Sequence, residues 1–369
     1  MKEQQPLLRP YQMSDLLLKN SMVMAPLTRS RADNPELKPT QMHVLYYRQR
    51  AYAGLIISEG SPVSKQAIGY INTPGIFSKT QVEGWKKVTE AVHEEGGKIF
   101  IQLWHCGSMS HPDFHGGNRP LSASDVNPNE KSYTPEGFKD TVAPKPMTLD
   151  EIAQTIQDFK SAAQNAKEAG FDGVEIHSSN GYLFHQFFNK HTNHRTDAYG
   201  GNIQNRARLL FDVLDAVRSV FPENRIGLRL NPALHNAFGM VADEETMPTF
   251  EYIVKKLNDF DLAYVHFSEP FTDVSKVPFL VSEIAKHFRP IYKGTLMINN
   301  QFDRKKGNKV IEDGYADLVS FGKLFISNPD LPKRFELDAP LNDWDQDTFY
   351  VPGEKGYTDY SFLEETVEQ

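Results

Sequence analysis

The chain has 369 residues, of which 39% are hydrophobic and 24% are charged, and its formal net charge is -8. This composition fits a globular protein with a substantial core, and the length allows one large barrel or two average domains. The negative charge excludes a general affinity for nucleic acid or for an anionic membrane surface. Because Cys106 is the single cysteine, no disulfide can form within the chain.

Targeting and metal-binding signals are absent from the sequence. Residues 1–6 contain no apolar run resembling a signal peptide, and no apolar stretch approaches the ~20 residues that span a bilayer. No cluster of cysteine and histidine has the spacing of metal ligands, so we expect no metal site. We therefore expect a cytoplasmic protein without a membrane or nucleic-acid partner.

Short apolar runs alternate along the chain with longer segments of helical period. The runs lack strict polar alternation, which is typical of parallel strands buried on both faces. Helices are expected at 80–95, 148–170 and 202–220; Thr148 and Glu151 form a capping-box pattern, and Gly170 marks a helix end. Eight strands alternating with helices predict an α/β fold, the (β/α)8 TIM barrel. The expected strands are 21–24, 55–58, 98–104, 174–177, 226–230, 263–267, 295–298 and 317–321.

We predict one domain over residues 1–369. The third strand is followed by an excess of Pro, Gly, Asn and Ser at about 105–147, which predicts an elaborated loop with a small hairpin that caps the site. The tail after Pro340 is rich in Asp, Gly and Tyr, and we expect it to wrap back onto the barrel.

The end of the fourth strand is the strongest functional signal. His177 and Asn180 can both donate hydrogen bonds, and the phenol of Tyr182 stays protonated at neutral pH. Such a trio can polarise a carbonyl group and deliver a proton. The alternative is a purely structural role, in which the histidine makes one internal hydrogen bond, Asn-Gly forms a turn, and the tyrosine packs in the core. Barrel enzymes build their sites at the carboxyl ends of the strands, so the position favours the functional interpretation.

Collinear motifs from about Pro10 to Phe362 resemble the Old Yellow Enzyme family, and within it the bacterial ene-reductases such as N-ethylmaleimide reductase and pentaerythritol tetranitrate reductase. Each motif alone is weak to moderate, but together they are specific. They are Ala25-Pro26-Leu27-Thr28-Arg29, Tyr46-Tyr47-Arg48-Gln49-Arg50-Ala51, Gln102-Leu103-Trp104-His105, Gly170-Phe171-Asp172-Gly173-Val174-Glu175-Ile176-His177, Gly181-Tyr182-Leu183, His185-Gln186-Phe187, Arg195-Thr196-Asp197, Tyr199-Gly200-Gly201, Asn205-Arg206-Ala207-Arg208 and Gly356-Tyr357-Thr358-Asp359-Tyr360.

The resemblance implies a barrel that binds flavin mononucleotide (FMN), takes hydride from NADPH or NADH, and reduces activated C=C bonds. The positive charge of Arg229 would lie where the reduced flavin is negative. A salt bridge inside the barrel, with Glu59 or Glu175, is the alternative for this arginine. By resemblance, the residues that contact the flavin ring are Pro26, Leu27, Thr28, Gly60, Gln102 and Arg229.

The resemblance also implies roles for the trio at the fourth strand. His177 and Asn180 would hold the oxygen of an α,β-unsaturated carbonyl or nitro compound while hydride passes from flavin N5 to the β-carbon, and Tyr182 would protonate the α-carbon. Relatives often have His at the position of Asn180, so this site should depend less on mild acidity. Aromatic positions of the substrate cleft match Tyr70, Trp104 and Tyr350, for which rim packing is the alternative.

The chain departs from the family pattern where the FMN phosphate is expected. The family tends to have glycine in the loop after the seventh strand, where this chain has Asn299-Asn300-Gln301. We expect Asn300 and Gln301 to keep the loop shape, since Asn tolerates a positive φ. After the eighth strand, Gly322-Lys323 replaces Gly-Arg; lysine cannot form a bidentate fork, so FMN should bind less tightly than in relatives with arginine.

Other functions compete with the ene-reductase hypothesis. One is a related flavin barrel that desaturates, demethylates, or reduces nitro compounds or nitrate esters. Another is a barrel enzyme for phosphorylated sugars without flavin, and a third is a non-catalytic barrel that binds a small ligand or a protein. The expected partners are small-molecule activated alkenes, and the expected oligomeric state is a monomer.

Overall fold

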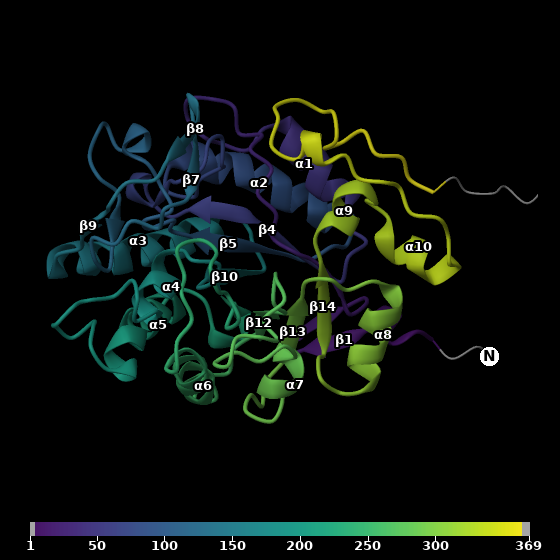
Figure 1. Ribbon diagram of the computed structural model, residues 1–369. Helices are drawn as coiled ribbons and strands as arrows, with labels where there is room; N and C mark the ends of the chain where they lie inside the picture. The colour runs from purple at the N-terminus through teal and green to yellow at the C-terminus, as the bar shows by residue number, and fades with distance from the viewer. Residues whose placement is uncertain (1–3, 364–369) are drawn as a thin grey trace, which may run out of the picture.

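The computed structural model describes residues 4–363. The first three residues of the segment inspected for a signal peptide, and residues 364–369 of the expected single domain, lie outside the described residues. A closed barrel of eight parallel strands forms the centre, and each strand pairs with the next barrel strand in the sequence (Figure 1). The fold prediction is therefore confirmed. The barrel strands are β3 (Met22–Met24), β4 (Leu55–Pro62), β5 (Ile99–Trp104), β10 (Gly173–His177), β11 (Ile226–Leu230), β12 (Tyr264–Ser268), β13 (Leu296–Asn299) and β14 (Leu318–Phe321).

Seven of the eight expected strands begin and end within one residue of the observed ones, and β4 is the exception. We expected this strand to stop at residue 58, but it continues to Pro62 after its pairing with β5 shifts register between Ile57 and Gly60. A Cβ at Gly60 would lie 2.7 Å from the indole of Trp104. Glycine thus lets the tryptophan lie against the strand, and Gly60 belongs to β4 rather than to the loop beyond it.

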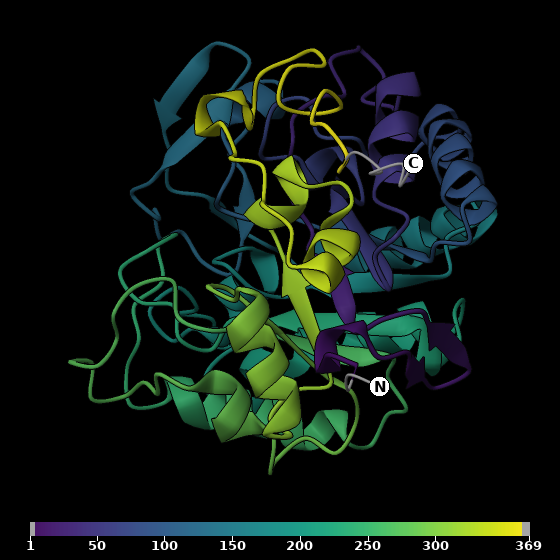
Figure 2. The same cartoon turned by 90° about the vertical axis from the view of Figure 1, so that its right-hand side faces the viewer.

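The helices lie around the outside of the strands (Figures 1 and 2). The predicted capping box is confirmed: the N–H of Glu151 donates to the Thr148 hydroxyl at 3.2 Å, and the N–H of Thr148 donates to the Glu151 carboxylate at 2.8 Å. Gly170 ends that helix with a φ of 85°. None of the described helices combines the length and the apolar character that crossing a membrane requires. The helices are α1 (Gln41–Gln49), α2 (Lys79–Glu94), α3 (Leu149–Glu168), α4 (Leu183–Phe188), α5 (Ile203–Arg218), α6 (Thr246–Leu257), α7 (Ile284–Phe288), α8 (Arg304–Glu312), α9 (Lys323–Ser327) and α10 (Leu331–Leu337).

Two small antiparallel hairpins lie outside the barrel. The N-terminal one, β1 (Tyr11–Met13) with β2 (Leu16–Leu18), was not predicted; its side chains join an apolar cluster with residues from inside the barrel strands. The other hairpin, β7 (Lys131–Thr134) with β8 (Gly137–Asp140), lies in the insertion 105–147 and confirms the predicted small hairpin. The same insertion contains the short parallel pair β6 (Leu121–Ser122) and β9 (Lys145–Pro146).

Three buried arginines hold the C-terminal tail, residues 348–357, against the barrel. Arg29 donates to the carbonyl oxygens of Phe349 and Gly356 at 3.1 and 2.7 Å, and Arg31 donates to that of Phe349 at 2.7 Å. Arg50, at the end of α1, donates to the carbonyl oxygen of Tyr357 at 3.3 Å. The tail lies next to α1 (Figure 1), and these hydrogen bonds confirm the prediction that it wraps back onto the barrel.

Candidate active site

Nine residues selected from the sequence line one cavity at the carboxyl ends of five neighbouring strands, β3, β4, β5, β10 and β11. These ends meet at one rim because all barrel strands run in the same direction. The cavity-lining residues are Pro26, Thr28, Gly60, Gln102, Trp104, His177, Asn180, Tyr182 and Arg229.

His177 and Asn180 present hydrogen-bond donors at the end of β10. The His177 Nδ1 lies 3.2 Å from the Ser179 hydroxyl; with that hydroxyl as donor, the imidazole proton is assigned to Nε2. Burial, and next the positive charge of Arg229, lowers the pKa of His177 well below 6.5, so the ring is neutral at pH 7. The Asn180 Oδ1 accepts from the side chain of Asn231 at 2.9 Å, which leaves the Asn180 NH2 group to donate.

A tight turn places Asn180 on the cavity wall. Asn180 and Gly181 have φ angles of 56° and 75°, in the left-handed region that Asn and Gly tolerate best. A Cβ on Gly181 would lie 2.5 Å from the Cβ of Phe238, so the turn requires glycine there. The turn and the functional interpretation of Asn180 are therefore compatible, because the turn directs the amide into the cavity.

Tyr182 belongs to an aromatic group that includes two further predicted residues. Its hydroxyl donates to that of Tyr70 at 3.2 Å, and the ring of Tyr70 stacks on Trp104 with centroids 5.3 Å apart. Burial raises the pKa of Tyr182 well above 10, so the phenol is protonated across the neutral range. By contrast, Tyr350 does not line the cavity; it lies in the C-terminal tail and is 50% exposed.

Arg229 and Gln102 lie deeper in the same cavity. The Arg229 side chain is 6% exposed and donates to Asn299 Oδ1 at 3.1 Å, while its Nε has no partner among residues 4–363. Within that range it forms no ion pair, so the alternative of a salt bridge with Glu59 or Glu175 is not supported. The Gln102 NH2 group donates to Glu175 at 2.7 Å.

Comparison with known proteins identifies the family. Residues 6–342 match the model described as the NADH:flavin oxidoreductase / NADH oxidase family. The chain belongs to this family. Its Old Yellow Enzyme character is supported by a solved Old Yellow Enzyme homologue from Zymomonas mobilis, which is 39% identical with a TM-score of 0.92 and covers 97% of this chain and 99% of that one. The resemblance noted in the sequence is thus confirmed.

Other Old Yellow Enzyme relatives match along their full length. A solved structure of morphinone reductase is 41% identical with a TM-score of 0.92 and covers all of both chains. The 12-oxophytodienoate reductase 1 of Oryza sativa subsp. japonica is 44% identical over 369 residues, 99% of this chain and 95% of that protein. Flavin oxidoreductase hxnT of Emericella nidulans is 39% identical, covering 98% of both chains.

Family membership makes this chain an NAD(P)H-dependent flavin oxidoreductase with FMN as its cofactor. The cavity fits a flavin ring. The buried Nε of Arg229 is a donor that lacks a protein partner, and the Gln102 Oε1 lies 3.2 Å from where a Cβ at Gly60 would be. Glycine at position 60 therefore keeps the strand from crowding the amide oxygen, which remains an acceptor on the cavity wall, and the arginine supplies a donor on another wall.

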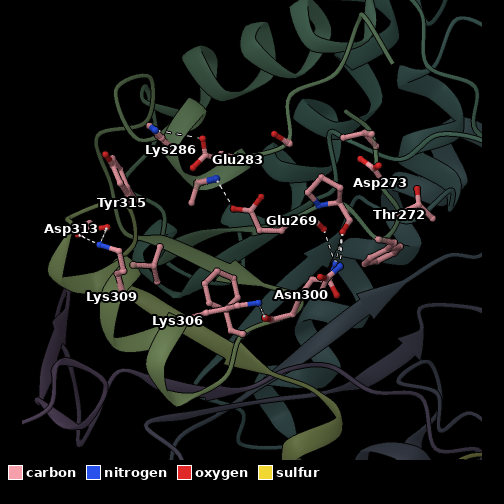
Figure 3. Close-up of a pocket in the computed structure, with 18 residues that line it drawn as sticks. Glu269, Thr272, Asp273, Glu283, Lys286, Asn300, Lys306, Lys309, Asp313 and Tyr315 are labelled. Atoms are coloured by element: carbon pink, nitrogen blue, oxygen red, sulfur yellow. Dashed lines mark hydrogen bonds and ion pairs between the residues drawn. The ribbon is translucent and has the colours of Figure 1, made fainter. Parts of the chain in front are cut away.

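The residues expected at the phosphate lie apart from this cavity. Asn300 and Gln301 have φ angles of 80° and 59°, so the prediction that the loop keeps a left-handed shape at Asn300 is confirmed. Both border a groove of about 650 Å³ between α7 and α8, where the Asn300 amide donates to the carbonyl oxygens of Glu269 and Pro270 (Figure 3). Their part in holding a phosphate stays a prediction.

Leu27, Gly322 and Lys323 lie where β14 ends. Leu27 is half-buried, and its Cδ2 would be 3.3 Å from a Cβ placed at Gly322. Lys323 is exposed, and its ammonium lies 5.7 Å from the ring centre of Trp344. The lysine is thus free to turn toward an anion at the rim of the barrel, as its predicted role requires, but the structure gives it no buried position.

Sequence reasoning did not identify the side-chain contacts that orient the cavity residues. Asn231 directs the amide of Asn180, and Glu175 binds the amide of Gln102. His266, inside β12, was missed although a histidine in the middle of an apolar run is a recognisable signal. Their contacts join strands that are distant in sequence, so only the closed barrel reveals them.

Proposed function

We propose that this enzyme reduces a carbon–carbon double bond conjugated to a carbonyl or nitro group. The observation that carries the proposal is the placement of two neutral donors, His177 and Asn180, beside the protonated hydroxyl of Tyr182 in one cavity. When bound, FMN supplies the hydride for the β-carbon, having received it from NADPH or NADH. Relatives named reductases of 12-oxophytodienoate and morphinone, both ketones by name, favour a carbonyl substrate.

His177 and Asn180 hold the substrate oxygen and polarise the double bond. As negative charge builds on that oxygen, both hydrogen bonds strengthen, which stabilises the transition state more than the bound substrate. Because the pKa of His177 is lowered by burial, the ring acts as a neutral donor. Asn180 carries no titratable proton, so mild acid adds nothing at this position.

Tyr182 gives its proton to the α-carbon. The hydroxyl is protonated at neutral pH because burial raises its pKa, so the acid form needs no partner to maintain it. Its hydrogen bond to the Tyr70 hydroxyl keeps a second proton within reach of the oxygen that becomes charged. Trp104, stacked on Tyr70, forms an apolar wall for the rest of the substrate.

FMN would be held at two places on the barrel rim, one for its ring and one for its phosphate. Thr28, Gln102 and Arg229 would hydrogen-bond the flavin ring, and Pro26, Leu27 and Gly60 would contact it. Backbone N–H groups of Asn300, Gln301 and Gly322 and the charge of Lys323 would hold the phosphate. A monomeric state and a cytoplasmic location stay predictions.

One experiment tests the proposal. The purified protein is reconstituted with FMN, and its visible spectrum is followed without oxygen while NADPH and then 2-cyclohexenone are added. Bleaching of the flavin band by NADPH and its return with the enone are the expected results. If the protein binds no FMN, the proposal fails; if the band bleaches but does not return with enones or nitroalkenes, the substrate class is wrong.

A further inference from the structure

Six buried polar residues form one continuous hydrogen-bonded chain across the barrel interior, through four contacts between side chains and one from a side chain to a main-chain carbonyl oxygen. Barrel interiors are usually filled by branched apolar side chains, so a polar layer spanning six strands calls for an explanation. Each side chain is at most 9% exposed. In the order in which each hydrogen-bonds the next, they are Gln102 (β5), Glu175 (β10), His266 (β12), Ser320 (β14), Asn299 (β13) and Arg229 (β11). We call these six residues the interior polar chain.

The first half of the interior polar chain fixes the amide of Gln102. Its NH2 group donates to one oxygen of Glu175 at 2.7 Å, and the Nδ1 of His266 lies 2.9 Å from the other. The Nε2 of His266 lies 2.7 Å from the Ser320 hydroxyl. Burial lowers the pKa of His266, so we assign a neutral ring that donates from Nδ1 and accepts from Ser320. Glu175 then accepts on both sides, as a carboxylate does.

The second half connects this carboxylate to Arg229. The Asn299 side chain donates to the Ser320 carbonyl oxygen at 2.8 Å and accepts from Arg229 at 3.1 Å. With His266 neutral, the interior polar chain contains one negative group, Glu175, and one positive group, Arg229, on the neighbouring strands β10 and β11. Within residues 4–363 Glu175 and Arg229 do not form a direct ion pair, so neither charge is neutralised by contact with the other.

We propose that Glu175 is a positioning residue that sets the redox potential of the bound flavin. Its carboxylate holds Gln102 with the amide oxygen toward the ring, and its negative charge offsets part of the stabilisation that Arg229 gives to the reduced cofactor. This inference rests on the proposed function, since it requires FMN in the cavity. The balance matters because the enzyme must both accept a hydride from NAD(P)H and pass it on: Arg229 favours the first step and Glu175 the second.

Two isosteric variants change the charge in opposite directions. Glu175→Gln removes the negative charge but can keep both hydrogen bonds, because its amide can accept from Gln102 and can donate to His266 Nδ1 once the neutral ring carries its proton on Nε2 and donates to Ser320. It should raise the flavin midpoint potential, shifting the reduction equilibrium by about tenfold if the charge acts over ~10 Å at an effective dielectric near 20. Asn299→Asp adds a carboxylate beside Arg229 and should lower the potential. Ser320→Ala is the control: it cuts the interior polar chain without changing charge and should leave the potential near that of the wild type.

The experiment is a spectroscopic redox titration of each FMN-loaded variant, with the FMN dissociation constant measured by fluorescence and each half-reaction by anaerobic stopped flow. Glu175→Gln should be reduced faster by NADPH and reoxidised more slowly by 2-cyclohexenone; a merely structural defect would slow both. An unchanged potential in Glu175→Gln would overturn the inference. If that variant does not fold, an unchanged potential in Asn299→Asp does so. A wild-type protein that binds no FMN would instead refute the proposed function.

Discussion

The hydrogen bond between Tyr182 and Tyr70 leads to a quantitative prediction for Tyr70→Phe. The Tyr182 hydroxyl donates to Tyr70 at 3.2 Å in the resting site. Once Tyr182 has given its proton away, its oxygen is negative, and the Tyr70 hydroxyl can turn to donate to it. The cavity otherwise destabilises a phenolate, because burial raises the pKa of Tyr182 well above 10 and also raises that of Tyr70.

The size of the effect follows from the difference between two hydrogen bonds. A bond to a charged group is worth about 1.5–3 kcal/mol and a neutral one about 1 kcal/mol. Tyr70→Phe removes the neutral hydrogen bond before proton transfer and the bond to the charged oxygen afterwards. Only the difference between them, about 0.5–2 kcal/mol, raises the barrier to proton transfer. This corresponds to a slowing of about 2–30-fold. Because Tyr70 touches the proton donor and not the hydride path, only the step that uses the alkene should slow.

Anaerobic stopped flow separates the two steps. The FMN-loaded variant is reduced with NADPH and then mixed with 2-cyclohexenone in H2O and in D2O. The variant should reduce at the wild-type rate, reoxidise more slowly, and show a larger solvent isotope effect because proton transfer limits the rate more. Tyr133→Phe, which removes a hydroxyl from the nearby hairpin, is the matched control. Equal slowing of both steps, or an unchanged isotope effect, would refute the reasoning.

Three further predictions concern other groups. Burial raises the pKa of Glu59 to about 7, so between about pH 4.5 and 7 the folded state holds a proton that the unfolded chain releases. The free energy of unfolding should therefore fall as pH rises through this range, by up to ~3 kcal/mol. Glu59→Gln should flatten this pH dependence in denaturant titrations, and an unchanged pH dependence would contradict the prediction. Lys323→Arg should lower the FMN dissociation constant by about 3–10-fold, since a guanidinium binds phosphate at two points; a higher constant in a fluorescence titration counts against a phosphate role. Alkene reduction should be constant between about pH 5.5 and 9 because the pKa values of His177 and Tyr182 are displaced outward, whereas Asn180→His should introduce an acid-side change in the pH profile.

The barrel and its rim were predictable because local patterns encode them. Apolar runs located seven strands to within a residue, and polar groups after those runs located His177, Asn180 and Tyr182. The extension of β4 was missed because polar residues after Ile57 imitate a strand end, while a register shift lets pairing continue to Pro62.

Long-range contacts were not predictable from such patterns. The N-terminal hairpin that packs against the barrel residues is too short to produce a recognisable period. Four of the five contacts in the interior polar chain join residues more than 50 positions apart, such as Gln102 and Glu175, and one residue per strand leaves no periodic trace. The left-handed backbone at Gln301 has no local signal in the sequence, since glutamine has no particular tolerance for it.

The hydrogen bonds from Arg29, Arg31 and Arg50 to the C-terminal tail affect which tail side chains can change during evolution. The three guanidinium groups bind main-chain carbonyl oxygens of the tail, which every amino acid provides. Exchanging an exposed tail side chain therefore leaves these hydrogen bonds intact, whereas Phe349 and Tyr357 are buried with their rings against the arginines. Evolution can vary Tyr350, and with it the mouth of the cleft, without loosening the segment that carries it.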